Sequence, residues 1–268
     1  MTLSTRIITS TVLVSVTASV IFFSNQTAFS ALAFGFVVLA LYEFFTMLRA
    51  AKIPSYRLFG VVMGAILTLV VAFEQGATRS GEVFFIVIGC LLLFVLQFSH
   101  KNNEEALTGI SLTLFGILYV SWFLSFTIKI RYLDGGAMWL AYLLSVTKAG
   151  DIGAYIFGSL FGRHSLIPHV SPKKSVEGMF GGLFLSLIMS LLFKPYLPLP
   201  WSWLHLSILG VLIGIVGQIG DLSESLLKRF CQIKDSGAIL PGMGGMLDAL
   251  DSILFTAPIF YYHLTVFS

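Results

Sequence analysis

The sequence predicts an all-α polytopic membrane protein with about nine membrane-spanning helices and a cytoplasmic N-terminus. The first reason is composition: the 268 residues are 57% hydrophobic and 11% charged, whereas a soluble domain is usually about 25% charged. The second is that apolar residues form long continuous runs, not the apolar–polar alternation of membrane β-strands. The third is that lysine and arginine gather in alternate connecting segments, as positive charge does on the cytoplasmic side of a membrane.

Each apolar run is long enough, or nearly so, for a spanning helix of about 20 residues. In chain order the runs cover residues 7–23, 28–48, 58–73, 83–98, 106–126, 137–161, 176–193, 206–222 and 252–267, the third and last being short. The first run is interpreted as an uncleaved helix and not as a signal peptide, because further runs of the same kind follow it.

The placement of basic residues orients these runs. With the N-terminus inside, the outside segments hold Arg79, Lys129, Arg131 and Lys194, and most of the 16 Lys and Arg residues fall inside. The opposite orientation would invert this bias. We therefore expect the polar loops of the C-terminal half to face the cytoplasm.

The sequence predicts one membrane domain with two regions. Residues 1–135 form an N-terminal scaffold of transmembrane helices, because their runs hold few charges, and residues 136–268 form a C-terminal region that holds the candidate catalytic residues and cytoplasmic loops. The net charge of +3 is small and scattered, which argues against nucleic acid as a partner. Cys90 and Cys231 are expected to be free thiols.

A charged pair lies inside the run at 137–161. Lys148 and Asp151 are three residues apart and can therefore meet on one helix face. Charges at membrane depth normally pair or face a wet cavity. Two interpretations stay open: a buried structural ion pair, or a polar wall of a substrate cavity to which Asp151 contributes.

A polar loop follows that run. It contains Ser171, Lys173 and Lys174, and Pro172 is expected to open the next helix, so that its N-terminal N–H groups face the loop. Lysines, serines and a helix N-terminus together suit phosphate oxygens. The alternative is a basic segment that contacts lipid head groups.

The richest group of polar residues flanks the last two runs. Asp221, Ser225 and Lys228 lie at i, i+4 and i+7 and share one face of a helix. Asp248 and Asp251 are three residues apart on the next helix, after a glycine-rich turn at 241–245. If the turn folds the two helices back side by side, the three aspartates converge.

Such a cluster of carboxylates near lipid needs a neutralising charge. Oxygen ligands without His or Cys favour a hard cation such as Mg²⁺, and Mg²⁺ in turn implies a phosphate substrate. Basic residues for the outer phosphate oxygens would be Lys228, Arg229 and Lys234. The alternative is a salt-bridged, solvated loop.

These residues resemble the phosphatidate cytidylyltransferase (CDP-diacylglycerol synthase) family over residues 145–258. The family motif is a serine, a Lys-Arg pair, a Lys-Asp pair, a Pro-x-His-Gly-Gly turn and Asp-Arg-x-Asp. At the family's spacing this chain has Ser225, Lys228, Arg229, Lys234, Asp235, the turn 241–245 and the segment 248–251. Segments 151–155 and 171–178 are also similar to the family. Met243 stands where the family usually has His, and Ala249 where it usually has Arg.

The resemblance implies that CTP and phosphatidic acid are joined to give CDP-diacylglycerol and pyrophosphate, in phospholipid biosynthesis. It implies Mg²⁺ on Asp221, Asp248 and Asp251, a second cation such as K⁺, and Lys228 and Arg229 as catalytic cations. Further substrate-binding residues are expected at Asp151, Ser171, Lys173, Lys174, Glu224, Ser225, Lys234 and Asp235. A homodimer is expected from the resemblance alone.

CTP is soluble and its partner is a lipid, so the active site is expected at the surface of the inner or plasma membrane, facing the cytoplasm. Another CTP-dependent lipid enzyme, such as a polyprenol kinase or a cytidylyltransferase for a different lipid phosphate, is an open alternative. A membrane transporter whose intramembrane charges form a pathway is another. A CDP-alcohol phosphotransferase is disfavoured, because its usual Asp-Gly-x-x-Ala-Arg opening is absent.

Overall fold

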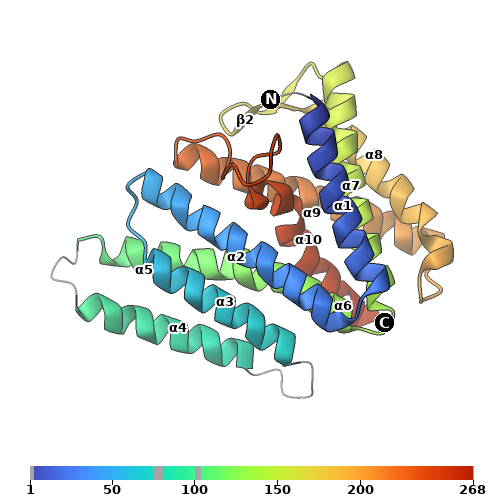
Figure 1. Ribbon diagram of the computed structural model, residues 1–268. Helices are drawn as coiled ribbons and strands as arrows, with labels where there is room; N and C mark the ends of the chain where they lie inside the picture. Colours follow the sequence, from blue (N-terminus) through green and yellow to red (C-terminus); the bar gives the residue numbers. More distant parts are fainter. Residues whose placement is uncertain (1–2, 75–80, 100–103, 268) are drawn as a thin grey trace. The chain divides into compact units, whose positions relative to one another are not determined.

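The computed structural model describes residues 3–74, 81–99 and 104–267 (Figure 1). In chain order its helices are α1 (Leu3–Phe23), α2 (Gln26–Ala50), α3 (Arg57–Phe73), α4 (Gly81–Phe98), α5 (Ala106–Gly116), the π-helical turn η1 (Ile117–Trp122), α6 (Phe123–Tyr132), α7 (Gly136–Phe161), α8 (Val176–Leu192), the 3₁₀ turn η2 (Lys194–Tyr196), α9 (Trp203–Phe230) and α10 (Met246–Phe267). Strands β1 (Ser165–Ile167) and β2 (Ser171–Ser175) form an antiparallel hairpin.

The all-α membrane fold predicted from the sequence is confirmed, and each predicted run coincides with a helix. Among the described residues, six helices are long and apolar enough to cross a membrane. They are Gln26–Ala50, Gly81–Phe98, Ala106–Tyr132, Val176–Tyr196, Trp203–Phe230 and Met246–Phe267. The apolar segments Ile7–Phe23 and Arg57–Phe73 are shorter, and in α7 two charged residues, Lys148 and Asp151, lower the mean hydropathy.

The orientation of these helices in a membrane stays a prediction. Of the basic residues on which it depends, Arg79 lies outside the described residues, whereas Lys129 and Arg131 lie at the end of α6. Lys129 binds Glu82 at 2.6 Å within the same unit.

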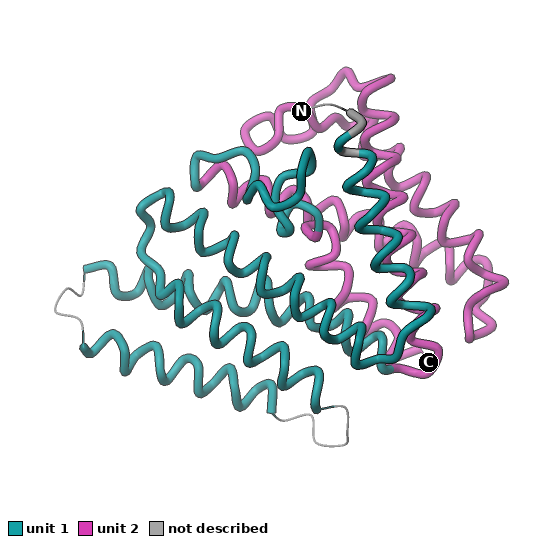
Figure 2. Tube along the Cα trace, in the orientation of Figure 1, with its two compact units in different colours: residues 1–132, 231–249 teal, residues 133–230, 250–268 magenta. Residues whose placement is uncertain are grey.

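The chain divides into two compact units that do not follow the order of the sequence (Figure 2). Unit 1 consists of residues 1–132 and 231–249, and unit 2 of residues 133–230 and 250–268. The sequence analysis divides the chain once, between residues 135 and 136. In the structure the loop after α9 and the first turn of α10 group with the N-terminal helices.

Unit 1 is built around α2. This helix begins after Asn25, whose side chain accepts a 2.9 Å hydrogen bond from the Ala28 N–H, the usual N-cap arrangement. Helix α2 packs against α3, and α3 in turn against α4 and η1 (Figure 1). Leu41, Phe44 and Phe45 of α2 are at most 1% exposed, and because lipid is as apolar as they are, close packing supplies most of the association energy.

The π-helical turn interrupts the helix predicted at 106–126, which continues to Tyr132. The Ser121 hydroxyl in this turn donates to the carbonyl oxygen of Gly64 on α3 and lies 2.9 Å from the Thr68 hydroxyl. These buried hydrogen bonds join η1 to α3 at the point where the helix repeat changes.

Unit 2 contains α7, α8, α9 and the rest of α10. Helices α7 and α8 lie side by side along much of their length (Figure 1), because small residues face each other. A Cβ atom on Gly153 would lie 2.5 Å from the Gly181 carbonyl oxygen, so the two backbones are in contact. Buried Tyr142 of α7 also reaches Ser190 of α8 through a 2.6 Å hydrogen bond.

The prediction that Pro172 opens a helix is wrong. Pro172 lies in strand β2, and α8 begins four residues later at Val176. The residue that starts the helix is Ser175, whose side chain accepts a 3.1 Å hydrogen bond from the Gly178 N–H. Serine is a stronger helix start than its neighbours because its oxygen satisfies such an N–H group, and a two-stranded hairpin tolerates Pro where no N–H is needed.

Candidate functional site

The charged pair predicted inside α7 forms, and a serine from α10 completes it. The Lys148 ammonium lies 2.9 Å from Asp151 Oδ2 and 2.9 Å from the hydroxyl oxygen of Ser252. The Ser252 hydroxyl in turn donates to the same Asp151 oxygen at 2.9 Å. The three groups form a closed triangle, so each charge at this depth is met by a polar partner, as charges in membrane proteins require.

Two more carboxylates of unit 2 lie beside this triangle. Asp251 of α10 is 8% exposed and interacts electrostatically with Asp221, Asp151 and Lys148. Asp221 of α9 is bound by Lys174 of β2 at 2.7 Å. We call Lys148, Asp151, Asp221 and Asp251 the charge cluster. It holds three carboxylates and one lysine, and Lys174 supplies a second cation at its edge.

Helix α9 can bring Asp221 to α10 because the preceding residue is Gly220. A Cβ atom there would lie 2.6 Å from the carbonyl oxygen of Asp251 and 3.3 Å from the Cα of Ser252. The backbones of α9 and α10 are therefore in contact at Gly220 and Asp251. Gly220 directly precedes Asp221, so this contact brings two carboxylates of the cluster to neighbouring positions.

We expect Gly220→Val to destabilise unit 2 and to disturb the charge cluster. Overpacking a tight contact usually costs about 1–3 kcal/mol, and here the clash is with backbone, which cannot rotate away. The measurement is thermal unfolding in detergent, with Gly35→Val as the control. A Cβ at Gly35 meets nothing within 4 Å, so an equal loss of stability in the two variants would contradict this account.

The basic residues at the end of α9 are each held by a neighbour. Lys228 pairs with the fully buried carboxylate of Glu224, one helical turn before it. The Arg229 Nε donates a 3.4 Å hydrogen bond to the Val170 carbonyl oxygen in the loop between β1 and β2. Ser225 lies on the same helix and is buried. The predicted face of Asp221, Ser225 and Lys228 is thus present on α9, with each of its two charged members in an ion pair.

The two lysines of the hairpin, Lys173 and Lys174, have different surroundings. Lys174 reaches Asp221, whereas Lys173 is exposed and Ser171 is partly buried. The base of the hairpin is closed by Glu177, whose carboxylate accepts the Arg163 N–H at 3.0 Å and lies 2.6 Å from the His164 ring nitrogen Nδ1. Lys174 is therefore the residue of this segment that the structure joins to the charge cluster.

Asp248 belongs to unit 1, where it is held by its own loop. One oxygen, Oδ2, accepts hydrogen bonds from the Ser236 N–H at 2.8 Å, the Ser236 hydroxyl at 2.8 Å and the Gly245 N–H at 2.7 Å. Lys234 and Asp235 precede this serine and are exposed. Asp251 follows three residues later on the same helix, in unit 2.

The glycine-rich turn of unit 1 is bound by the first helix of the chain. The Thr9 hydroxyl of α1 donates to the Pro241 carbonyl oxygen at 2.8 Å, and the Ser10 hydroxyl donates to the Met243 sulfur at 3.2 Å. Gly242 and Gly244 adopt φ values of 81° and 100°, which glycine reaches without strain. Met243, which replaces the usual His of the motif, therefore has a specific contact in this chain.

The donor atoms of the cluster suit a hard cation. They are carboxylate oxygens, with the Ser252 hydroxyl beside them. The side chains of Asp221 and Asp151 are 36% and 31% exposed, so an ion can reach them. Oxygen ligands favour Mg²⁺ over softer metals. Within the part of the chain that the structure describes, however, no group of three or more His, Cys, Asp or Glu side chains is arranged to hold a metal ion. The cations that pair with Asp151 and Asp221 are Lys148 and Lys174.

Three residues of these networks were not among the predicted site residues: Lys148, Ser236 and Ser252. Each stands beside or one turn from an aspartate that the sequence analysis selected. For Lys148 and Ser252 the signal is a polar group near a carboxylate in an otherwise apolar run, because a charge in a membrane needs a polar partner. Ser236 lies in the polar loop before α10, and its position beside Asp235 is the only local signal.

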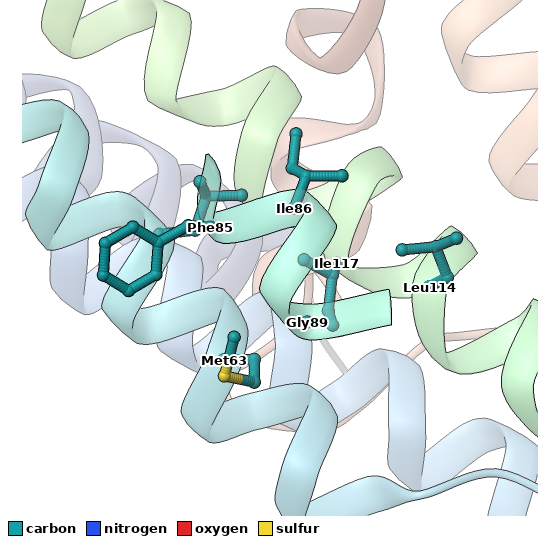
Figure 3. A pocket seen from close by; sticks show the side chains of 7 residues that line it. Met63, Phe85, Ile86, Gly89, Leu114 and Ile117 are labelled. Atoms are coloured by element: carbon teal, nitrogen blue, oxygen red, sulfur yellow. The ribbon is translucent and has the colours of Figure 1, made fainter. Parts of the chain in front are cut away.

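Unit 1 also contains an apolar pocket, which none of these residues lines (Figure 3). It lies between α3, α4 and the α5–η1 helix and is lined by Met63, Leu67, Phe85, Ile86, Gly89, Leu114 and Ile117. All of these residues are apolar, so the pocket offers no group for a phosphate or a metal ion.

Comparisons with known proteins give one family. The sequence profile of the cytidylyltransferase family matches residues 4–267. A phosphatidate cytidylyltransferase of Bacillus subtilis is 31% identical over 96% of this chain and 97% of its own length. One of Synechocystis is 34% identical, with 86% of each chain covered. An uncharacterised Escherichia coli protein, YnbB, is 34% identical over 84% of this chain and 75% of its own length.

Proposed function

The chain belongs to the cytidylyltransferase family, and from this we propose that it is a phosphatidate cytidylyltransferase. It would join CTP and phosphatidic acid to give CDP-diacylglycerol and pyrophosphate. Relatives with this name are aligned over 96% and 86% of the chain and support this proposal. We also propose the roles of the site residues, the bound metal ion and the side of the membrane that the active site faces.

The single observation that carries the proposal is the charge cluster in an apolar helical unit. The cluster gathers three carboxylates and one lysine, with Lys174 at its edge, and taking so many charges out of water costs more free energy than a single structural pair would. Lys148 pairs with Asp151 and Lys174 with Asp221. When a cation and a triphosphate bind, the cation would take the place of the lysines at the carboxylates, and the lysines would be free to bind the phosphates.

The reaction needs positioning more than proton transfer. A phosphate oxygen of phosphatidic acid attacks the α-phosphorus of CTP, a P–O bond forms, and the bond to the pyrophosphate oxygen breaks. The nucleophile is already an anion near neutral pH, so no strong general base is required. Rate acceleration then comes from holding the two substrates in line and from neutralising their charge.

Asp221, Asp248 and Asp251 would hold Mg²⁺, with a second cation such as K⁺ beside it. When bound, the metal would supply positive charge to the triphosphate and to the leaving pyrophosphate. The oxygen-only donor set and the partial exposure of Asp221 support this assignment.

The basic residues would bind the phosphates. Lys174, Lys228 and Arg229 are each held by an acceptor that a phosphate oxygen can replace. The other residues of the substrate site would be Asp151, Ser171, Lys173, Glu224, Ser225, Lys234 and Asp235. Ammonium and guanidinium groups make their strongest hydrogen bonds with such oxygens.

The protein would lie in the inner or plasma membrane, with its active site facing the cytoplasm, where CTP is found. The excess of basic residues in the C-terminal loops supports that side. A homodimer is proposed from the family resemblance. Phosphatidic acid would enter from the surrounding lipid, because a diacyl lipid does not leave the bilayer readily.

The test is release of pyrophosphate by the purified protein in detergent micelles. We expect release only when CTP, phosphatidic acid and Mg²⁺ are all present, and we expect EDTA to stop it. Omission of each component in turn is the control. Release that needs CTP but accepts a polyprenol in place of phosphatidic acid would indicate a different CTP-dependent lipid enzyme. No release in any mixture would contradict the proposal and favour a transporter.

A further inference from the structure

Glu43 is an acidic residue in the middle of the apolar helix α2. Its side chain is 2% exposed. In the structure its Oε2 atom accepts the Leu247 N–H at 2.8 Å and lies 3.3 Å from the Ser236 hydroxyl. Both partners belong to the segment 231–249 that groups with the N-terminal helices in unit 1. A buried carboxylate in a membrane helix is thus bound to a loop about two hundred residues away in sequence.

The place where Glu43 binds is the N-terminus of α10, which begins at Met246. The first N–H groups of a helix have no partner within the helix, and the residue before it usually supplies an oxygen from its own side chain. Here that residue is Gly245, which has no side chain. Glu43 delivers the missing oxygen to Leu247 from a different helix.

Gly245 leaves the room that this arrangement requires. A Cβ atom at that position would collide with the Ser236 hydroxyl and with Glu43 Oε2. Gly237 leaves similar room, because a Cβ there would collide with the other carboxylate oxygen, Oε1. That oxygen has no hydrogen-bond partner among the residues that the structure describes. The two glycines therefore flank a carboxylate that is hydrogen-bonded through Oε2 and not through Oε1.

Asp248 supplies the other half of the helix cap. It is the third residue of α10, and its carboxylate reaches back to the Gly245 N–H at 2.7 Å, as the acidic residue of a capping box does. The Ser236 hydroxyl lies between the two acids, 2.8 Å from Asp248 Oδ2 and 3.3 Å from Glu43 Oε2. Glu43 and Asp248 are therefore joined through one serine and one helix terminus.

We propose that Glu43 is a positioning residue: it acts as the N-cap of α10 from another helix and thereby fixes the direction of the Asp248 carboxylate. This inference rests on the proposed function, in which Asp248 is a metal ligand. The three donors that orient Asp248 through one oxygen belong to Ser236 and Gly245. Glu43 contacts Ser236 directly, and through Leu247 it holds the first turn of α10, which follows Gly245.

The first test needs no substrate. Hydrogen–deuterium exchange of the purified protein, followed by mass spectrometry, is measured for wild type, Glu43→Ala and Glu43→Gln. We expect Glu43→Ala to raise exchange at least tenfold in peptides covering residues 236–249, because the Leu247 N–H loses its acceptor. Glu43→Gln keeps an acceptor oxygen and is expected to retain most of the protection.

Ser30→Ala is the matched control. Ser30 is also a buried polar residue of α2, and its hydroxyl donates to the Gln26 carbonyl oxygen of its own helix. It should leave exchange in 236–249 unchanged. Unchanged exchange in Glu43→Ala would overturn the proposal, and so would an equal rise in every peptide, since Glu43 would then support the whole fold and not this segment.

The second test uses pyrophosphate release with CTP and phosphatidic acid. A carboxylate displaced by about 1 Å can cost on the order of a hundredfold in rate, so we expect Glu43→Ala to lower kcat by about 10- to 100-fold with the KM for phosphatidic acid nearly unchanged. Glu43→Gln should recover most of the rate. A raised KM at full kcat, or a Gln variant as slow as Ala, would overturn the positioning role. If wild type releases no pyrophosphate, the proposed function fails, and the exchange experiment still decides whether Glu43 caps α10.

Discussion

Asp221→Asn is expected to reduce pyrophosphate release on the order of a thousandfold. Asn matches the size of Asp and can still accept a hydrogen bond from Lys174, but it lacks the charge that a metal ion needs. Charge stabilisation by a bound metal is worth several kcal/mol, and each 1.4 kcal/mol or so is tenfold in rate. The measurement is kcat at saturating CTP, phosphatidic acid and Mg²⁺, and the same loss is expected for Asp251→Asn.

Asp134→Asn is the matched control for these variants. Asp134 is an exposed residue of the turn before α7, so its replacement removes the same charge from the same unit without touching the cluster. Full activity in Asp221→Asn would contradict the metal assignment. For Asp248→Asn, protein stability must be measured together with activity. Asp248 also caps α10, and loss of a helix cap by itself lowers the free energy of unfolding by about 0.5–2 kcal/mol.

Lys148→Met is expected to destabilise the protein and to abolish most of its activity. The change removes the cation that interacts electrostatically with Asp151, Asp221 and Asp251. Removing one partner of a fully buried ion pair costs about 3–5 kcal/mol. The side chains of Lys148 and Asp151 are 38% and 31% exposed, so screening reduces the cost, and we expect about 1–2 kcal/mol. Thermal unfolding in detergent measures it.

The double variant Lys148→Met/Asp151→Asn separates the two interpretations of this pair. It restores the charge balance, so we expect the unfolding temperature to return close to that of wild type. If the pair is part of the substrate site, activity stays low in the double variant. If activity returns together with stability, the pair is structural only, and the proposed role of Asp151 is wrong.

The membrane fold could be predicted from the sequence because it depends on composition over long windows. A run such as 28–48 is apolar throughout, and no soluble arrangement hides nine such runs, so the helices followed directly. The hairpin at 165–175 was not predicted, because Pro172 fits the first turn of a helix as well as it fits an edge strand. The choice of Ser175 as the helix start is decided by one hydrogen bond to Gly178.

The residues of the candidate site could be predicted from the sequence, but most of the contacts between them could not. Spacing within a helix gives the Lys148–Asp151 pair, because i,i+3 neighbours share a face. The pairs Lys174–Asp221 and Glu43–Leu247 join residues of different helices or strands, and no local spacing encodes them. The role of Glu43 in particular depends on a glycine at the helix start, which removes the usual capping oxygen and makes room for a distant one.

The measurement that tests the central claim most directly is the fate of the phosphates of CTP. The purified protein is incubated with phosphatidic acid, Mg²⁺ and CTP that carries ³²P either at the α- or at the γ-position, and the lipids are extracted. A cytidylyltransferase transfers the α-phosphorus, so we expect the α-label in the lipid fraction and the γ-label in released pyrophosphate. The γ-label in the lipid fraction would mean that the protein is a CTP-dependent kinase, and would contradict the account.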